Sequence, residues 1–422
     1  MIMRTVGALL ISTALGAGAI GAAVKLNQSP QAFIGEHDWE RSRPGPDSGR
    51  VAILIDALAH TDPVVCELIG DQLGNFWWSG AESGVGRLAA TPVTLQAAKD
   101  SIGGTITDER AIRRLVAELD GPNACTRRVA SKLLGRSTIS GARLATLLGD
   151  ASANVRESAA LAAGNGEHKD TRAALVRALD DRSPAVAAMA AWALGEIEDH
   201  ASVPSLLKFV RSGDTRVRLA SIWALGQIED ARAVPDIIAT LQDPNANVRA
   251  LSAEVLGSIE KPEAIKPLER ALAGDTEASV RAEAASSLGK ISSSSSGAAL
   301  GRALSDQNVE VRRAAAEALG DLDELHVAPA GLVAALSSTD PELRYRAAQA
   351  LAEIADPATT SALVGLVSTG DAELRKHAIE ALGNIGSPAA IQAITKALTD
   401  SDPEVRKAAA EALGEIKDSS GE

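Results

Sequence analysis

The strongest constraint on the fold is a short motif, ALGxI or a close variant, that recurs every 31 or 32 residues along most of the chain. The glycine of the motif, or Ala352 in the same position, occurs at Gly195, Gly226, Gly257, Gly289, Gly320, Ala352, Gly383 and Gly414. A weaker form of the same frame continues toward the N-terminus at Gly164, Gly135, Gly103 and Gly74. Self-similarity at a fixed period predicts one repeated unit stacked on itself, and not several unrelated domains. We number the copies one to twelve from Gly74 to Gly414, and count positions within a copy from its glycine at zero.

Each copy has the pattern of two helices. In the last one, "SPAAIQAITKALTDSDPEVRKAAAEALGEI", an apolar helical segment at residues 389–398 is followed by a polar turn. Asp402 is suited to cap a second helix, and Pro403 suits the first position of that helix. Neither helix can bury its apolar stripe alone, so adjacent copies must pack together. The sequence therefore predicts an all-α fold, an α-solenoid built as a superhelical stack of antiparallel helix pairs, whose N-terminal copies are degenerate.

The segments "DPEVRKAAAEALGEI", "DPELRYRAAQALAEI" and "DTRVRLASIWALGQI" resemble HEAT repeats of the short, phycobilisome-lyase-like type. The resemblance is clear from about Asn154 to the end and weak from about Arg50 to Asn154. It implies that the second helices line the concave side of the solenoid. It leaves the function open, because the family includes bilin lyase subunits, a di-iron hydroxylase of deoxyhypusine and many binding scaffolds.

We divide the chain into residues 1–23, 24–49, 50–153, 154–417 and 418–422. The first segment has Arg4, a long uncharged stretch and small residues near its end, which is the pattern of a secretory signal peptide. The alternative is an uncleaved membrane anchor, since about 20 uncharged residues can span a bilayer. A polar linker, the degenerate repeats, the regular repeats and a polar tail follow in that order. We expect a periplasmic or secreted protein or, in the alternative, a membrane-anchored one with its repeats outside the cytoplasm.

Composition and motifs argue against several functions. The net charge of −13 opposes nucleic-acid binding, which needs a basic face. No nucleophile-elbow, Walker or dinucleotide motif occurs, and the six histidines lack metal-ligand spacing. The di-iron hydroxylases use His-Glu dipeptides as ligands, and this sequence has none. We therefore expect no cofactor, no metal and no enzymatic activity, with a bilin-lyase-like subunit as the alternative.

The apolar positions of the second helix in the last copy, −9, −6, −5, −2, −1 and +2, predict a buried stripe and leave −7, −4, −3 and +1 facing solvent. Position −3 is polar in nine copies and apolar in three consecutive ones, where it holds Leu161, Trp192 and Trp223. Leu219 at −7 and Ile222 at −4 belong to the same region. We interpret these five residues as a partner-binding stripe. The alternative is that the tryptophans fold over the groove between copies and complete the core.

An arginine recurs at position −8. It occurs at Arg127, Arg156, Arg218, Arg249, Arg281, Arg312, Arg344, Arg375 and Arg406, whereas copy five has Ala187. We assign this column to structure, with each guanidinium bonding to carboxylates, turn carbonyls or caps and tying adjacent copies together.

The only cysteines, Cys66 and Cys125, belong to copies one and three. Regular stacking separates such copies too far for a disulfide. Because copy two is Gly-rich and irregular, a Cys66–Cys125 disulfide and two free thiols both remain open.

These features together predict an exported, non-enzymatic scaffold that binds a protein or peptide on its concave face near copies four to six. A purely architectural spacer or sensor region is a further alternative.

Overall fold

The computed structural model describes residues 48–59 and 104–419. Within them, ten helix pairs follow the short helix α2 (Ser48–Ala59). The first helices of the pairs are α5 (Glu109–Glu118), α7 (Gly141–Leu147), α9 (Arg172–Ala178), α11 (Val203–Leu206), α13 (Val234–Thr240), α15 (Ile265–Gly274), α17 (Gly297–Ala303), α19 (Ala330–Ala335), α21 (Thr360–Thr369) and α23 (Pro388–Ala397). The second helices are α6 (Ala124–Gly135), α8 (Ala153–Asn165), α10 (Pro184–Glu196), α12 (Thr215–Ile228), α14 (Ala246–Ile259), α16 (Ala278–Ile291), α18 (Val309–Gly320), α20 (Pro341–Ile354), α22 (Ala372–Ile385) and α24 (Pro403–Ser419).

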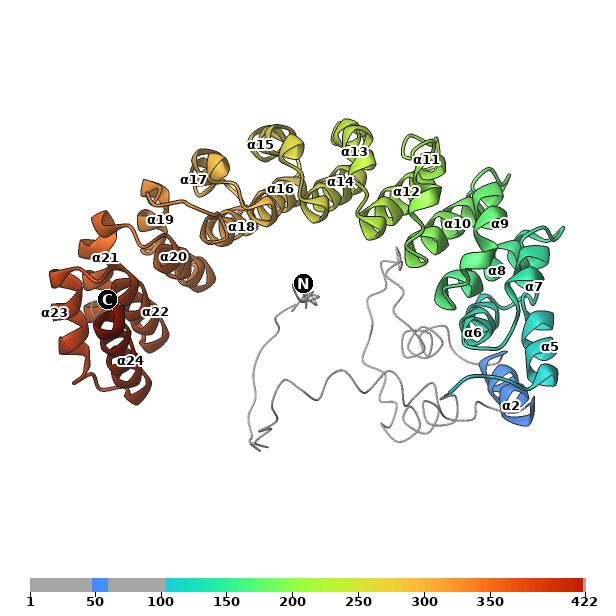
Figure 1. The fold of residues 1–422 in the computed structure, drawn as a ribbon, viewed down its shortest axis with the longest axis horizontal. Helices are drawn as coiled ribbons and strands as arrows, with labels where there is room; N and C mark the ends of the chain where they lie inside the picture. Colours follow the sequence, from blue (N-terminus) through green and yellow to red (C-terminus); the bar gives the residue numbers. More distant parts are fainter. Residues whose placement is uncertain (1–47, 60–103, 420–422) are drawn as a thin grey trace.

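The helix pairs stack side by side into an arch (Figure 1). The second helices line its inner, concave side, and the first helices form the outer layer. Each second helix packs against the second helices of the neighbouring copies and against the first helix of its own copy. The predicted all-α solenoid is confirmed for copies three to twelve. The predicted signal segment lies outside the described residues.

Local sequence sets both ends of a second helix. The Asn245 side chain accepts a hydrogen bond from the Asn247 N–H at the start of α14, at 2.9 Å, and Asp340 caps α20 in the same way. Both residues are favoured N-caps because the side-chain oxygen satisfies a backbone donor that the helix leaves free. Helix α14 ends at Glu260, which has a left-handed backbone with φ of 53°. The turn into the next copy follows at once, and this fixes the short period.

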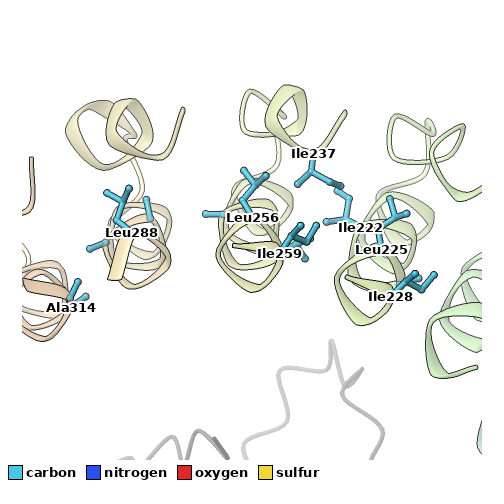
Figure 2. Close-up of a cluster of buried hydrophobic side chains, with 14 of the residues drawn as sticks. Ile222, Leu225, Ile228, Ile237, Leu256, Ile259, Leu288 and Ala314 are labelled. Carbon is cyan, nitrogen blue, oxygen red and sulfur yellow. The ribbon is translucent and has the colours of Figure 1, made fainter. Parts of the chain in front are cut away.

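The core runs continuously from copy to copy (Figure 2). Leu225, Leu256 and Leu288 occupy position −1 of successive copies, and none of the three has exposed surface. Ile228 and Ile259 at position +2 are buried beside them. The leucines point toward the outer helices and the isoleucines lie between adjacent inner helices, so each copy completes its core only with its neighbours.

The repeated glycine allows adjacent second helices to approach closely. A Cβ atom placed on Gly289 would lie 2.9 Å from both the Cα and the Cβ of Ala318 in the next copy. Any larger residue would push the two helices apart. The Ser287 hydroxyl, on the same helix, donates a 2.8 Å hydrogen bond to the Ala253 carbonyl of the preceding copy. Small residues at positions 0 and −2 therefore set the tight spacing of the concave layer.

The prediction that position −4 of the second helix faces solvent is wrong. Among the described copies three to twelve, position −4 is exposed only in copy twelve, at Ala410, and is buried in the others. Ile222, Ala253 and Ile379 have no exposed surface there. The reason is that this flank of the helix packs on the following copy, and the last copy has none after it.

No helix in residues 48–59 or 104–419 combines the length and the apolar character needed to cross a membrane.

Candidate binding surface

The two tryptophans of copies five and six are neighbours on the concave helices. Their rings stack with centroids 6.3 Å apart and planes 19° apart. A Cβ on Gly164 would lie 2.6 Å from Cζ3 of Trp192, and one on Gly195 would lie 2.9 Å from Cζ3 of Trp223. Each ring thus lies over the glycine of the preceding copy, where the missing side chain makes room for it.

The structure divides the predicted stripe into buried and accessible parts. Trp192 is 8% exposed, Leu161 is 6% exposed and Ile222 has no exposed surface. The expectation that these three face solvent is wrong, because Trp192 fills the groove over Gly164, Leu161 is part of the buried core and Ile222 is at the buried −4 position. Trp223 and Leu219 are only half-buried and pack at the edge of the core. The accessible apolar surface is therefore centred on these two residues of α12.

Two half-buried carboxyl groups lie on the helices of copies four and five, Glu157 in the first turns of α8 and Glu196 at the C-terminal end of α10. Burial, and then the nearby charges of Glu167 and Glu198, raise the pKa of Glu196 to about 7. Burial also raises the pKa of Glu157, although three arginines oppose this effect. Glu196 directly follows Gly195, over which the Trp223 ring lies, so a partly desolvated carboxyl group is near this ring.

The arginine column clasps adjacent copies together. Arg249 donates from Nε and Nη2 to the two carboxylate oxygens of Asp275 in the next copy, at 2.7 and 2.8 Å. Its Nη1 donates to the Asp243 carbonyl of its own turn, at 2.8 Å. The hydrogen bonds to Arg249 lower the pKa of Asp275. Equivalent ion pairs cross four other boundaries between copies. They join Arg156 to Asp181, Arg218 to Asp243, Arg281 to Asp306 and Arg375 to Asp400.

Four members of the column lack this close pair with the next copy. One is Arg127, whose Nη1 donates to the Gly121 carbonyl of its own turn. Arg312 and Arg406 donate Nη1 only to carbonyls of their own turns. Arg344 also bonds to its turn, and its Nη2 lies 3.6 Å from Asp371. Beside Arg312, Arg313 bonds to Asp340 instead.

Sequence reasoning missed the aspartate that receives each guanidinium. These aspartates stand at position −14, two residues before the predicted caps, at Asp181, Asp243, Asp275, Asp306 and Asp400. The sequence does contain a signal for this pairing, because the arginine and its partner aspartate are lost together. Ala187 replaces the arginine in copy five, and Ser212 stands where copy six would carry the aspartate. The stacked tryptophans lie at this boundary between copies five and six.

Cys125 lies at the start of α6 and has no free thiol in the structure. Cys66 lies outside the described residues, so its pairing with Cys125 remains a prediction. In the described part of the chain, no group of three or more His, Cys, Asp or Glu side chains is placed to hold a metal ion.

The repeats also match known sequences. The family model for HEAT repeats matches residues 141–218, 203–289, 270–330 and 329–414, which together span more than half of the chain. The chain belongs to the HEAT-repeat family. The family match is to HEAT repeats in general, and the phycobilisome-lyase-like subtype remains a prediction. No catalytic family is indicated.

Solved structures give similar folds. A chain in the structure that describes how Kap95p binding induces the switch loops of RanGDP to adopt the GTP-bound conformation is 14% identical, with a TM-score of 0.53. That match covers 87% of this chain and 56% of the other, so this HEAT-repeat chain spans about half its length. An engineered protein is 24% identical over 83% of this chain and 98% of its own, with a TM-score of 0.48. No curated protein matches the sequence.

Proposed function

We propose that this HEAT-repeat protein is a non-enzymatic scaffold that binds a protein or peptide on its concave face, with the half-buried Trp223 and Leu219 as apolar anchors. The observation that carries the proposal is the stack of Trp223 on Trp192. The buried ring holds the accessible one in place, and a rigid, partly exposed aromatic side chain is typical of residues that dominate interface energy. The similar fold in the Kap95p and RanGDP structure supports a protein partner.

A peptide library tests the proposal without a known partner. A phage-displayed random-peptide library is selected on the purified chain, and the recovered peptides are titrated against Trp223→Ala and Leu219→Ser. We expect each variant to lose about 1 to 2 kcal/mol of binding free energy, which is about 5- to 30-fold in Kd. Leu398→Ser is the matched control, because Leu398 is 38% exposed and ends the outer helix α23. Equal losses in all three variants, or peptides unaffected by the two α12 variants, would contradict the proposal.

We further propose that the protein is exported. Arg4, the uncharged residues 5–24 and the small residues near the end of that stretch favour a cleaved signal. N-terminal sequencing of the protein from its native cell is expected to find a start after residues 19–23. Intact Met1 in the cytoplasm would refute export, and intact Met1 in the membrane would favour the anchor.

A further inference from the structure

The Trp223 ring stacks on another ring on one side only. Its partner is Trp192 of the preceding copy, and Trp223 has no second ring contact among the described residues. Copy seven does not continue the stack, because Glu254 occupies position −3 of α14. The groove over Gly226, which a third ring would fill, holds the side chain of Val255, whose Cγ2 would lie 2.7 Å from an added Cβ. Glu254 is therefore left exposed at the position next to Trp223.

Trp223 and Glu254 occupy the same position on adjacent helices of the concave layer. Helices α12 and α14 pack directly against each other (Figure 1), and packed helices lie about 8 to 10 Å apart. A bound cation lies within about 6 Å of an indole centroid and about 2.8 Å from a carboxylate oxygen. One cationic side chain can therefore reach both residues at this separation.

Glu254 differs from the other glutamates at position −3 of the described copies. Each of those has a basic side chain within ion-pair distance, which joins Glu317 to Arg346, Glu380 to His377 and Glu411 to Lys407. Ala250 stands one turn before Glu254, where copy twelve carries Lys407. Lys290 of copy eight does not come within the 4.0 Å limit of an ion pair with Glu254. Within the described part of the chain, the Glu254 carboxylate has neither a hydrogen bond nor an ion pair.

We propose that Trp223 and Glu254 together bind the cationic side chain of an arginine or lysine in the partner. The inference rests on the proposed function, and it names the residue type that the anchor site accepts. The indole face attracts a cation, and the carboxylate beside it supplies the complementary charge. Arginine suits the site best, because a planar guanidinium stacks on an aromatic ring and bonds to a carboxylate at the same time. The half-buried Leu219, one turn before Trp223, offers apolar surface to the aliphatic stem.

A double-mutant cycle with the library peptides tests the inference. In each peptide that needs Trp223, Arg is replaced by citrulline, which keeps the shape and removes the charge, and Lys is replaced by acetyl-lysine. We expect one basic residue per peptide whose neutralisation raises Kd about 3- to 10-fold on the wild-type chain. On Glu254→Gln the same replacement is expected to change Kd about 2-fold or less, because the carboxylate that the cation pairs with is gone.

Two further variants locate the effect. Glu317→Gln is the matched control, because Glu317 has the same position two copies away, farther than the Debye length of about 8 Å at physiological salt. It is expected to keep the full effect of citrulline. Trp223→Leu keeps an apolar side chain and removes the indole face, so it is expected to weaken the Arg peptide about 3- to 10-fold and the citrulline peptide about 2-fold or less. Thermal melts check that every variant folds.

A capped tripeptide, acetyl-Gly-Arg-Gly-amide, tests the site without the library. The chain is prepared with isotope-labelled tryptophan, and the indole N–H signal of Trp223 is assigned by its loss in Trp223→Phe. The Arg tripeptide is expected to shift this signal. The citrulline tripeptide at the same concentration, or the Arg tripeptide on Glu254→Gln, is expected to shift it much less.

The outcomes separate this inference from the proposed function. Library peptides that need Trp223 but contain no Arg or Lys, or that bind as tightly after neutralisation, would refute the cation site and leave the proposed function in place. Equal effects of citrulline on the wild type and on Glu254→Gln would overturn the role of Glu254 and so the inference. A library without any peptide dependent on Trp223 would contradict the proposed function. In that case a shift that depends on Glu254 would still support the cation site, and no shift would overturn it.

Discussion

The clasp between Arg249 and Asp275 gives the sharpest test of how the copies are held together. The two side chains are 13% and 9% exposed, and two parallel hydrogen bonds join them. Arg249→Met keeps most of the aliphatic stem and removes the guanidinium, so the Asp275 carboxylate stays largely buried without its main partner. Breaking a buried pair on one side costs about 3 to 5 kcal/mol. Because Asp275 still accepts the Glu277 N–H at 2.9 Å, we expect a loss of about 2 to 4 kcal/mol.

Arg312→Met is the matched control. Arg312 has the same position in copy nine and the same bonds to its own turn, but it makes no ion pair with the next copy. Its removal is expected to cost about 1 kcal/mol, the usual net value of such hydrogen bonds. Because a solenoid can unfold in parts, the assay is hydrogen exchange of the amides in α14 and α16, or in α18 for the control, beside urea unfolding of the full chain.

Acid supplies an independent check on the same clasp. Arg249 lowers the pKa of Asp275 from its ordinary value of 3.8. A lowered carboxyl pKa contributes stability that is present above the unfolded pKa and is lost as pH falls through the folded pKa. The difference between wild type and Arg249→Met is therefore expected to be full at neutral pH and to shrink below about pH 4. Equal losses for the two arginines, or a difference that persists unchanged in acid, would refute this account of the clasp.

Three further predictions concern the two tryptophans, Glu196 and the two cysteines. Trp192→Ala is expected to cost about 3 to 5 kcal/mol of stability and Trp223→Ala about 1 to 2; urea unfolding measures both, and the reverse order would contradict the assigned burial. The pKa of Glu196 is raised from its ordinary value of 4.5 to about 7 in the fold, so stability is expected to rise as pH falls from about 8 to 5. Melting temperatures measure this rise, and Glu196→Gln is expected to flatten it. Mass spectrometry of unreduced peptides is expected to find Cys66 joined to Cys125, and alkylation of both thiols without reduction would disprove the bond.

The period of the sequence was sufficient to predict the solenoid and most of its core. Leu256 at position −1 and Ile259 at +2 are buried as the periodicity indicates, because Leu256 points toward the outer layer and Ile259 lies between α14 and α12. The error at position −4 came from using the last copy as the template. Ala410 is exposed there only because no copy follows it, whereas Ile222 packs on a neighbour.

The predicted stripe shows a different limit. Both Trp192 and Trp223 occupy position −3, which is exposed where it holds Glu254 or Glu317. Whether a ring at this position is buried depends on the room over the preceding glycine and on the ring that follows it. The burial of such a ring therefore depends on the copies before and after it, and the pattern of its own helix does not predict it.

The clasp also determines how a chain of this kind can change its length. Copies four, seven and eight each offer an arginine to the following copy, and copies five, eight and nine each receive one on an aspartate. A copy that carries both halves can be duplicated or deleted as a whole period, and each new boundary still joins an arginine to an aspartate. Ser212 breaks this interchangeability, because a copy that starts with it cannot receive an arginine from any predecessor. Copies five and six are therefore tied to each other by their tryptophans, and an insertion between them would separate the stacked pair while insertions elsewhere leave it intact.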